Sequence, residues 1–281
     1  KQPKYTCKLN KEYMMRKKLI VSGCSFTDKD FESMSVPDYD CSFPKWPELL
    51  AKKLDMDCIN LGANGAGNNY IYSTLLEEIT RTPKDEIGLV LAAWSQTNRE
   101  DYQTYSWGAL QSSHRDRYNN NMEWKGTRLG RKGDLFYWIK DTLRHYISLE
   151  NLCKNHNLPY KQFQMINAFE GYLSGLHKTD YEVVANLDNP LFVKRYKYSD
   201  VTDNDLIVCL NLFLEYEKII DTKNFIGYPP TQYLGGHTVE DKCLGSKSKA
   251  EQKGLVISEY DFHPNKKGHE KIAEFLYDRL G

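Results

Sequence analysis

The chain contains the stretch KKLIVSGCSFT at residues 17–27, in which a short apolar run ends in a turn of small residues. Such a run is typical of a buried strand in a parallel sheet. A second stretch, EYDFHPN at residues 259–265, sets a histidine beside acids close to the C-terminus. Ser25 in the first stretch and His263 with Asp261 in the second are the residue types of a nucleophilic hydrolase. They can meet only if the whole chain folds as one unit.

Between these two stretches, short apolar runs alternate with segments of helical periodicity. Strands are expected at 17–23, 57–61, 87–94, 160–166 and 254–258, and helices at 46–54, 68–79, 135–155, 205–220 and 266–280. Strands that alternate with helices imply βαβ crossovers and a mostly parallel sheet. The expected fold is therefore a three-layer α/β/α sandwich around a parallel sheet of about five strands.

The same pattern predicts the domain organisation. Residues 1–13 are polar and aperiodic and are expected to be an arm, and residues 14–281 are expected to form a single domain. Segments 100–133 and 168–200 break the βα rhythm and are expected to be insertions, and 221–253 is expected to be a loop. Long irregular segments inside a domain are usually functional.

Charge and hydropathy exclude several classes of protein. Lys+Arg and Asp+Glu both total 38, so the formal net charge is zero and no overall field favours nucleic acid or an anionic membrane as a partner. No apolar run has the roughly 20 residues needed to span a bilayer, and no signal peptide is evident. These absences predict a cytoplasmic location.

The seven cysteines are scattered and form no C-x-x-C pair. This spacing predicts reduced, mostly buried thiols. No closely spaced Cys/His set suggests a metal, and no motif requires a cofactor, so neither is expected.

Four segments with polar or small residues follow the predicted strands or precede the last helix. They hold Ser25, the glycine-rich run 62–67, the run 94–99, and Asp261 with His263. Ligands of open α/β sheets bind beyond the carboxyl ends of the strands. The four segments are therefore expected to converge on one candidate active site.

These blocks resemble those of the SGNH (GDSL-like) hydrolases. The G-C-S-F-T form at 23–27 is similar to a subgroup met in bacterial and bacteriophage proteins, and the resemblance implies a flavodoxin-like SGNH fold with Ser25 as nucleophile. The bacteriophage members also imply a virion-associated location as the alternative to the cytoplasm, with a virion component or another protein as a candidate partner. It covers the first hundred residues and the C-terminal end of the chain. His263, followed by Pro264 and a helix, matches the family's base. The family acid normally lies three residues before the histidine, where this chain has Tyr260, so Asp261 is the expected substitute and Glu259 the alternative.

The resemblance also implies an oxyanion hole, the set of donors that binds the negative oxygen of the tetrahedral intermediate. Its expected donors are the N–H groups of Ser25 and Gly65, with Gly62 as the second choice for the glycine. Where the family has an asparagine that completes the oxyanion hole, the sequence of this chain departs from the family pattern. Gln96 and Asn98 both remain candidates for that donor.

Candidate substrate-binding residues are Gly62, Trp94, Arg99 and Trp107. Arg99 suits an acidic group, and the aromatic residues around 100–124 suit stacking on a sugar, although core packing is the usual role of aromatics. The predicted function is a serine esterase or deacylase that hydrolyses an O-acyl ester, such as O-acetyl, on a carbohydrate.

Other interpretations remain open for the same residues. Ser25 alone would suit a helix N-cap, and Gly62-x-x-Gly65-x-Gly67 could cradle a phosphate. Cys24 is expected to be a buried thiol, not the nucleophile, and His269 is expected on the exposed face of the last helix. Because two family blocks depart from the pattern, the alternative function is a catalytically inert protein of the same fold that binds glycans or forms part of a virion.

Overall fold

The computed structural model describes residues 16–97, 99, 101, 122–124, 127–129, 135–168, 203–245 and 253–280. Its centre is a five-stranded sheet in the order β2-β1-β3-β6-β7, in which every neighbouring pair is parallel. The strands are β1 Lys18–Gly23, β2 Asp57–Asn60, β3 Ile87–Trp94, β6 Tyr160–Gln164 and β7 Phe225–Ile226. This flavodoxin-like order confirms the fold class predicted from the sequence.

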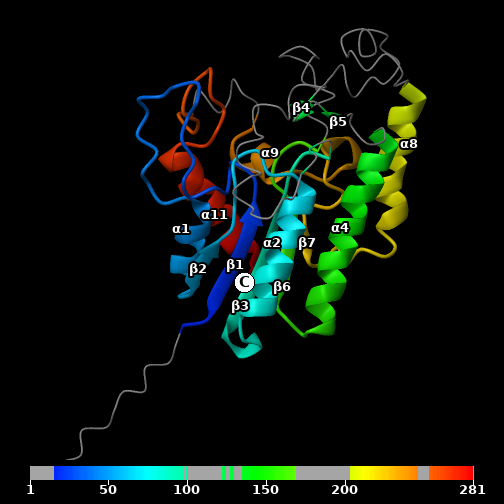
Figure 1. The fold of residues 1–281 in the computed structure, drawn as a ribbon, viewed down its shortest axis with the longest axis horizontal. Helices are drawn as coiled ribbons and strands as arrows, with labels where there is room; N and C mark the ends of the chain where they lie inside the picture. Colours follow the sequence, from blue (N-terminus) through cyan, green and yellow to red (C-terminus); the bar gives the residue numbers. More distant parts are fainter. Residues whose placement is uncertain are drawn as a thin grey trace, which may run out of the picture.

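Both faces of the sheet are covered by helices (Figure 1). On one face lie α2 Asn68–Arg81, α4 Leu135–Asn155 and α8 Asp203–Tyr216. On the other lie α1 Trp46–Lys53, α9 Val239–Cys243 and α11 Lys266–Leu280. Short 3-10 turns at Lys84–Glu86 and Gln232–Leu234 complete the described helical segments.

The alternation of side chains along β1 explains why this strand is apolar throughout. Ile20 packs into the core beside α2 and α4, whereas Leu19 and Val21 pack into the core beside α1 and α11. All three side chains are fully buried. A strand buried on both faces reads as a continuous apolar run, which is what residues 19–21 show.

Helices α1 and α11 are joined by a buried histidine. His269 Nδ1 accepts a hydrogen bond of 3.1 Å from the backbone N–H of Trp46, the first residue of α1. His269 is 3% exposed, so the expectation that it lies on the exposed face of the last helix is wrong. The physical reason is that an imidazole supplies the acceptor that a helix N–H in the first turn lacks.

The fifth strand differs from the sequence expectation. Residues 254–258 form no strand of the sheet, and only an isolated antiparallel bridge joins Val256 to Pro264. The strand beside β6 is instead β7, which lies with α9 in the segment 221–253 that was expected to be a loop. Two residues are too few to show an apolar period, so the pattern could not reveal β7.

The expected insertions are described only in part. Within 100–133, β4 Met122–Trp124 and β5 Thr127–Leu129 form an antiparallel pair. Nearly all of 168–200, and the arm at 1–13, lie outside the described residues. Across the described part of the chain, no helix combines the length and the apolar character needed to cross a membrane.

Candidate active site

Ser25 lies in a tight turn immediately after the central strand β1. The turn is closed by a hydrogen bond of 2.7 Å from the Thr27 N–H to the Cys24 carbonyl. A Cβ atom on Gly23 would lie 2.2 Å from Thr27 Oγ1, so the turn needs glycine at this position. Cys24 is fully buried, in line with a packed thiol. The turn therefore holds Ser25 at the carboxyl edge of the sheet.

Ser25 and His263 are in direct contact although 238 positions separate them in the chain. Ser25 Oγ lies 2.8 Å from His263 Nε2. The Ser25 residue is 6% exposed and the His263 side chain 28% exposed. This geometry suits proton transfer between the hydroxyl and the imidazole.

Asp261, and not Glu259, is the carboxylate that reaches His263. Asp261 Oδ1 lies 2.5 Å from His263 Nδ1 and also accepts the His263 backbone N–H at 3.0 Å. Because the carboxylate can only accept a hydrogen bond, Nδ1 of His263 carries the ring proton. Nε2 is then the acceptor for the Ser25 hydroxyl. The shortened D-x-H spacing is therefore accommodated by a turn in which one carboxylate oxygen meets both N–H groups of the histidine.

Burial alone would raise the pKa of the Asp261 carboxyl, but hydrogen bonds from His263 and Ser33 outweigh it and lower that pKa to about 2. Asp261 is consequently an anion throughout the neutral range. A buried anion next to an imidazole stabilises the protonated form of that ring.

Two aromatic rings fix the plane of the imidazole. The ring centroid of Phe31 lies 4.2 Å from that of His263, and the ring centroid of Phe26 lies 5.1 Å away. Both phenylalanines are buried. Neither was predicted as a site residue. Phe31 lies in a polar loop with no periodicity that would mark it.

The loop after β2 brings Gly65 to the same edge of the sheet. Gly65 has a φ of +70°, in the left-handed region that favours glycine. Its neighbour Asn64 donates its backbone N–H to Asp28 Oδ2 at 2.8 Å, which ties this loop to the loop that follows Ser25. Within the described residues, the N–H groups of Ser25 and Gly65 have no hydrogen-bond partner.

Gly62 has a different role from the one expected. Its N–H donates to Asn60 Oδ1 at 3.0 Å, so this group is already occupied. A Cβ atom at Gly62 would lie 2.8 Å from the backbone carbon of Thr27. Gly62 therefore permits close packing of the two loops and does not offer its N–H to a ligand.

The segment after β3 carries Gln96 and Arg99. Arg99 Nε donates to Gln96 Oε1 at 2.8 Å, and Arg99 Nη1 donates to the Ala66 carbonyl at 3.3 Å. Arg99 thereby bridges the loops that follow β2 and β3. Gln96 is nearly buried, at 6% exposure, and Asn98, the other amide candidate, lies outside the described residues.

Trp94 is not a substrate-binding residue. It is fully buried in the core, and its indole Nε1–H donates to Gln162 Oε1 at 3.0 Å. As the last residue of a strand covered on both faces, its side chain packs under helix α4 instead of facing the site. Trp107 lies outside the described residues.

Two further residues near the site were missed from the sequence. Asp101 accepts the backbone N–H groups of Gly67 and Tyr70 at 2.9 and 2.8 Å and so caps the start of α2. Ser33 donates to Asp261 Oδ2 at 2.5 Å. Spacing could not reveal either residue, because each contacts a partner distant in the chain.

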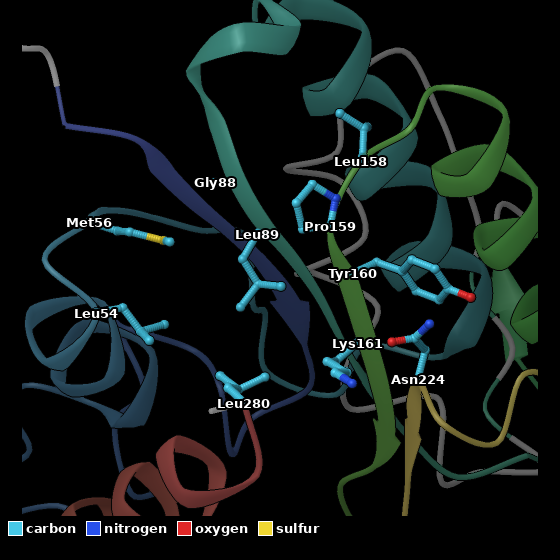
Figure 2. Close-up of a pocket in the computed structure, with 10 residues that line it drawn as sticks. All are labelled: Leu54, Met56, Gly88, Leu89, Leu158, Pro159, Tyr160, Lys161, Asn224 and Leu280. Atoms are coloured by element: carbon cyan, nitrogen blue, oxygen red, sulfur yellow. The ribbon is translucent and has the colours of Figure 1, made fainter.

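No group of three or more His, Cys, Asp or Glu side chains in the described part of the chain could hold a metal ion. A pocket of about 390 Å³ opens at the amino ends of β3 and β6, the opposite edge of the sheet from Ser25 (Figure 2). Its lining is mainly apolar, including Leu54, Met56, Leu89 and Leu280.

Comparisons with known proteins locate the chain among solved structures only. No protein-family model and no curated protein matches it. A protein assigned to the lipolytic G-D-S-L family from Desulfitobacterium hafniense is 11% identical, with a TM-score of 0.45, and the alignment covers 93% of this chain and 98% of that one.

Two other solved structures are of related kinds. A variant of an acetyl-xylooligosaccharide esterase from Geobacillus stearothermophilus is 12% identical, with a TM-score of 0.45 and 95% of each chain covered. A lipolytic G-D-S-L family member from Veillonella parvula is 13% identical, with a TM-score of 0.41, 93% of this chain and 96% of that chain being covered. At such identities and TM-scores, these likenesses assign neither activity nor substrate to this chain.

Proposed function

We propose that this protein is a serine hydrolase of the SGNH type that cleaves an O-acyl ester. The observation that supports this most directly is the position of His263, whose Nε2 lies 2.8 Å from Ser25 Oγ while its Nδ1 lies 2.5 Å from Asp261. A serine, a base and an orienting acid in this order form the recurring constellation of acyl-transfer enzymes on unrelated folds.

In the proposed mechanism, Ser25 Oγ attacks the ester carbonyl while His263 Nε2 accepts the hydroxyl proton. The tetrahedral intermediate collapses when the C–O bond to the leaving alcohol breaks, and His263 returns the proton to that alcohol. A water molecule then attacks the acyl-enzyme with His263 as base, which releases the acid and restores Ser25. Asp261 remains ionised throughout and stabilises the imidazolium.

The proposed oxyanion hole uses the N–H groups of Ser25 and Gly65 and one side-chain amide. The N–H groups of Ser25 and Gly65 have no other partner in the described chain, which suits them to this task. The amide is that of Gln96 or Asn98. Removal of one such donor typically raises the barrier by roughly 3 kcal/mol, so the side-chain amide is testable by substitution.

The proposed substrate is a carbohydrate that carries an O-acyl group, with O-acetyl as the specific candidate. Support for a sugar comes from the aromatic residues of the sequence between 100 and 124, among them Trp107. Arg99 donates to the carbonyl of Ala66, the residue that follows Gly65. A guanidinium in that position suits an acidic group on the substrate.

Covalent labelling with a fluorophosphonate tests the reaction type. The wild-type protein is expected to be labelled at Ser25 and to hydrolyse p-nitrophenyl acetate, and Ser25→Ala is expected to lose both without unfolding. Cys24→Ala is the matched control, because it removes the neighbouring buried thiol and should retain labelling. A folded wild-type protein that takes no label would overturn the proposal and favour the inert, glycan-binding or virion-associated alternative.

A panel of esters tests the acyl group and the carrier. Acetylated xylooligosaccharides and p-nitrophenyl esters of two to eight carbons would be compared by kcat/KM. The proposal requires the highest value for acetyl esters and a gain when the alcohol is a sugar. A preference for long acyl chains on simple alcohols would contradict the carbohydrate assignment while leaving the serine mechanism intact.

A further inference from the structure

Ser33 lies in the loop between β1 and α1 and is buried against the proposed acid. Its Oγ lies 2.5 Å from Asp261 Oδ2, across 228 positions of sequence. Ser33 is 5% exposed, whereas Glu32, Met34 and Ser35 around it are exposed. The loop thus turns this one hydroxyl inward among neighbours that face solvent. In Figure 1 this loop and the segment before α11 lie side by side.

Ser33 is the donor to Asp261, because the ionised carboxylate can only accept a hydrogen bond. The backbone N–H of Val36 donates to Ser33 Oγ at 2.9 Å, which occupies the hydroxyl as an acceptor. Asp261 Oδ1 meanwhile accepts both the backbone N–H and the ring Nδ1–H of His263. The two carboxylate oxygens are thus divided between His263 and Ser33.

We propose that Ser33 is a positioning residue that acts through Asp261, so that the working unit is a chain of four side chains, Ser33–Asp261–His263–Ser25. The inference rests on the proposed hydrolase function and deepens it. With only one residue between Asp261 and His263, the turn commits Oδ1 to the histidine and directs Oδ2 towards the β1–α1 loop. Ser33 keeps its proton and donates only a hydrogen bond, so no proton leaves the Asp261–His263 pair.

Removal of the Ser33 hydroxyl would leave a buried carboxylate oxygen without a partner among the described residues. Such a group loses a charge-assisted hydrogen bond, which is stronger than a neutral one. The carboxylate could then rotate away from His263 to regain solvation, and His263 would lose its orientation towards Ser25. Phe31 of the same loop packs on the His263 ring, so the loop touches both members of the pair.

The first test is a double-mutant cycle on the rate of Ser25 labelling by a fluorophosphonate. Ser33→Ala should slow labelling roughly tenfold, the size expected for loss of one charge-assisted hydrogen bond. Ser35→Ala, an exposed serine of the same loop, should leave the rate unchanged. In an Asp261→Ala background, Ser33→Ala should have no additional effect, because its route to Ser25 is already broken. Equal rates for Ser33→Ala and wild type, or additive losses in the double variant, would overturn the inference.

The second test does not depend on catalysis. The Nδ1 proton of His263 in its short hydrogen bond to Asp261 should give a low-field proton NMR resonance. Ser33→Ala should shift or broaden this resonance, and Ser33→Cys, which keeps a side chain of similar shape with a weaker donor, should give an intermediate effect. An unchanged resonance in folded variants would refute the positioning role. If the wild type takes no label, the proposed function fails, while this resonance still decides the role of Ser33.

Discussion

Asp261 is buried and yet remains an anion, because three hydrogen-bond donors point at its two carboxylate oxygens. They come from the His263 backbone, the His263 ring and the Ser33 hydroxyl. The backbone contact forms within a single turn, whereas the Ser33 contact depends on the folded chain. The local part of this arrangement could be anticipated from the D-x-H pattern, and the distant part could not.

The first prediction concerns acid stability at Asp261. Its pKa is lowered from 3.8 to about 2 in the folded protein, because the bonds from His263 and Ser33 outweigh the opposing effect of burial. The unfolded chain therefore binds this proton first, and the stabilisation, present above pH 4, is lost as the pH falls towards 2. The lost free energy of unfolding is about 2 kcal/mol. Urea unfolding between pH 5 and pH 2 should show this loss in the wild type and not in Asp261→Asn. Parallel curves for the two proteins would contradict it.

Phe31 and Ser33 mark the limit of sequence reasoning at the residue scale. Both lie in a polar loop between β1 and α1, where no period separates inward from outward side chains. Their burial depends on the segment around His263, which is far away in the chain. By contrast, Ser25 and His263 are marked by the residues next to them, the small-residue turn and the proline before a helix.

At the scale of elements, α1 and α11 are held together by apolar packing, by the ion pair of Lys53 with Glu274, and by a buried hydrogen bond from the Trp46 N–H to His269 Nδ1. The imidazole can accept this bond only while Nδ1 carries no proton. The junction between these two helices is therefore sensitive to acid in a way that purely apolar packing is not.

The second prediction follows from that junction. Burial, together with the nearby charge of Lys45, lowers the pKa of His269 from 6.5 to about 3. The unfolded chain binds this proton below pH 6.5 and the folded chain does not, so stability falls as the pH drops from 6.5 towards 3. By pH 4 the loss is about 3 kcal/mol. His269→Asn, which retains an acceptor, should flatten the decline in denaturation curves, while the control His156→Asn, on an exposed histidine, should not. Equal slopes for both variants would exclude His269 as the cause.

The third prediction concerns the start of α2. Gly67 and the first turn of this helix provide no acidic side chain, and Asp101 supplies the cap from the segment after β3. Asp101→Ala should lower the free energy of unfolding by about 1–2 kcal/mol, as expected for loss of a charged cap. The exposed acid Asp38 offers a control, for which Asp38→Ala should change stability little. Thermal unfolding measures both, and an unaltered midpoint in Asp101→Ala would show that the cap contributes nothing.

Elements with a long apolar signal were predictable, and those without one were not. The predicted bounds of β3, α4 and α11 match the structure, since each is a long periodic or continuous apolar run. β7 was missed, and 254–258 was wrongly expected to be a strand. The position of β7 is set instead by tertiary bonds, such as the Gln162 N–H to the Asn224 carbonyl at 2.9 Å and the Asp221 N–H to Glu150 at 3.0 Å.

At the scale of the molecule, the proposed site draws on segments from both ends of the chain. β1 and β3 are adjacent in the sheet, and the connections on either side of them run in opposite directions. Crevices form at such a switch point, at the carboxyl edge of the strands. The strand order therefore explains why Ser25, at the end of β1, lies where the loops after β2 and β3 also arrive. The apolar pocket of Figure 2 lies at the other edge and shares no residue with this site.

The fourth prediction is that the two faces of the sheet unfold together. Trp46 lies in the core beside α1 and α11, and Trp94 lies in the core beside α2 and α4. Urea unfolding of Trp46→Phe and of Trp94→Phe would each be followed by far-UV circular dichroism and by tryptophan fluorescence. If the chain is one folding unit, the two probes should give the same midpoint within each variant. Two separated transitions would instead indicate two independent units.

The turn from Asp261 to His263 has a mechanical consequence. Because the carboxylate grips both the backbone and the ring of the same histidine, the acid and the base move as one rigid piece. A displacement of the segment before α11 would therefore change two separations together, that of His263 Nε2 from Ser25 Oγ and that of Asp261 Oδ2 from Ser33 Oγ. The alignment of the proposed active site therefore depends on the position of the β1–α1 loop relative to the segment before α11.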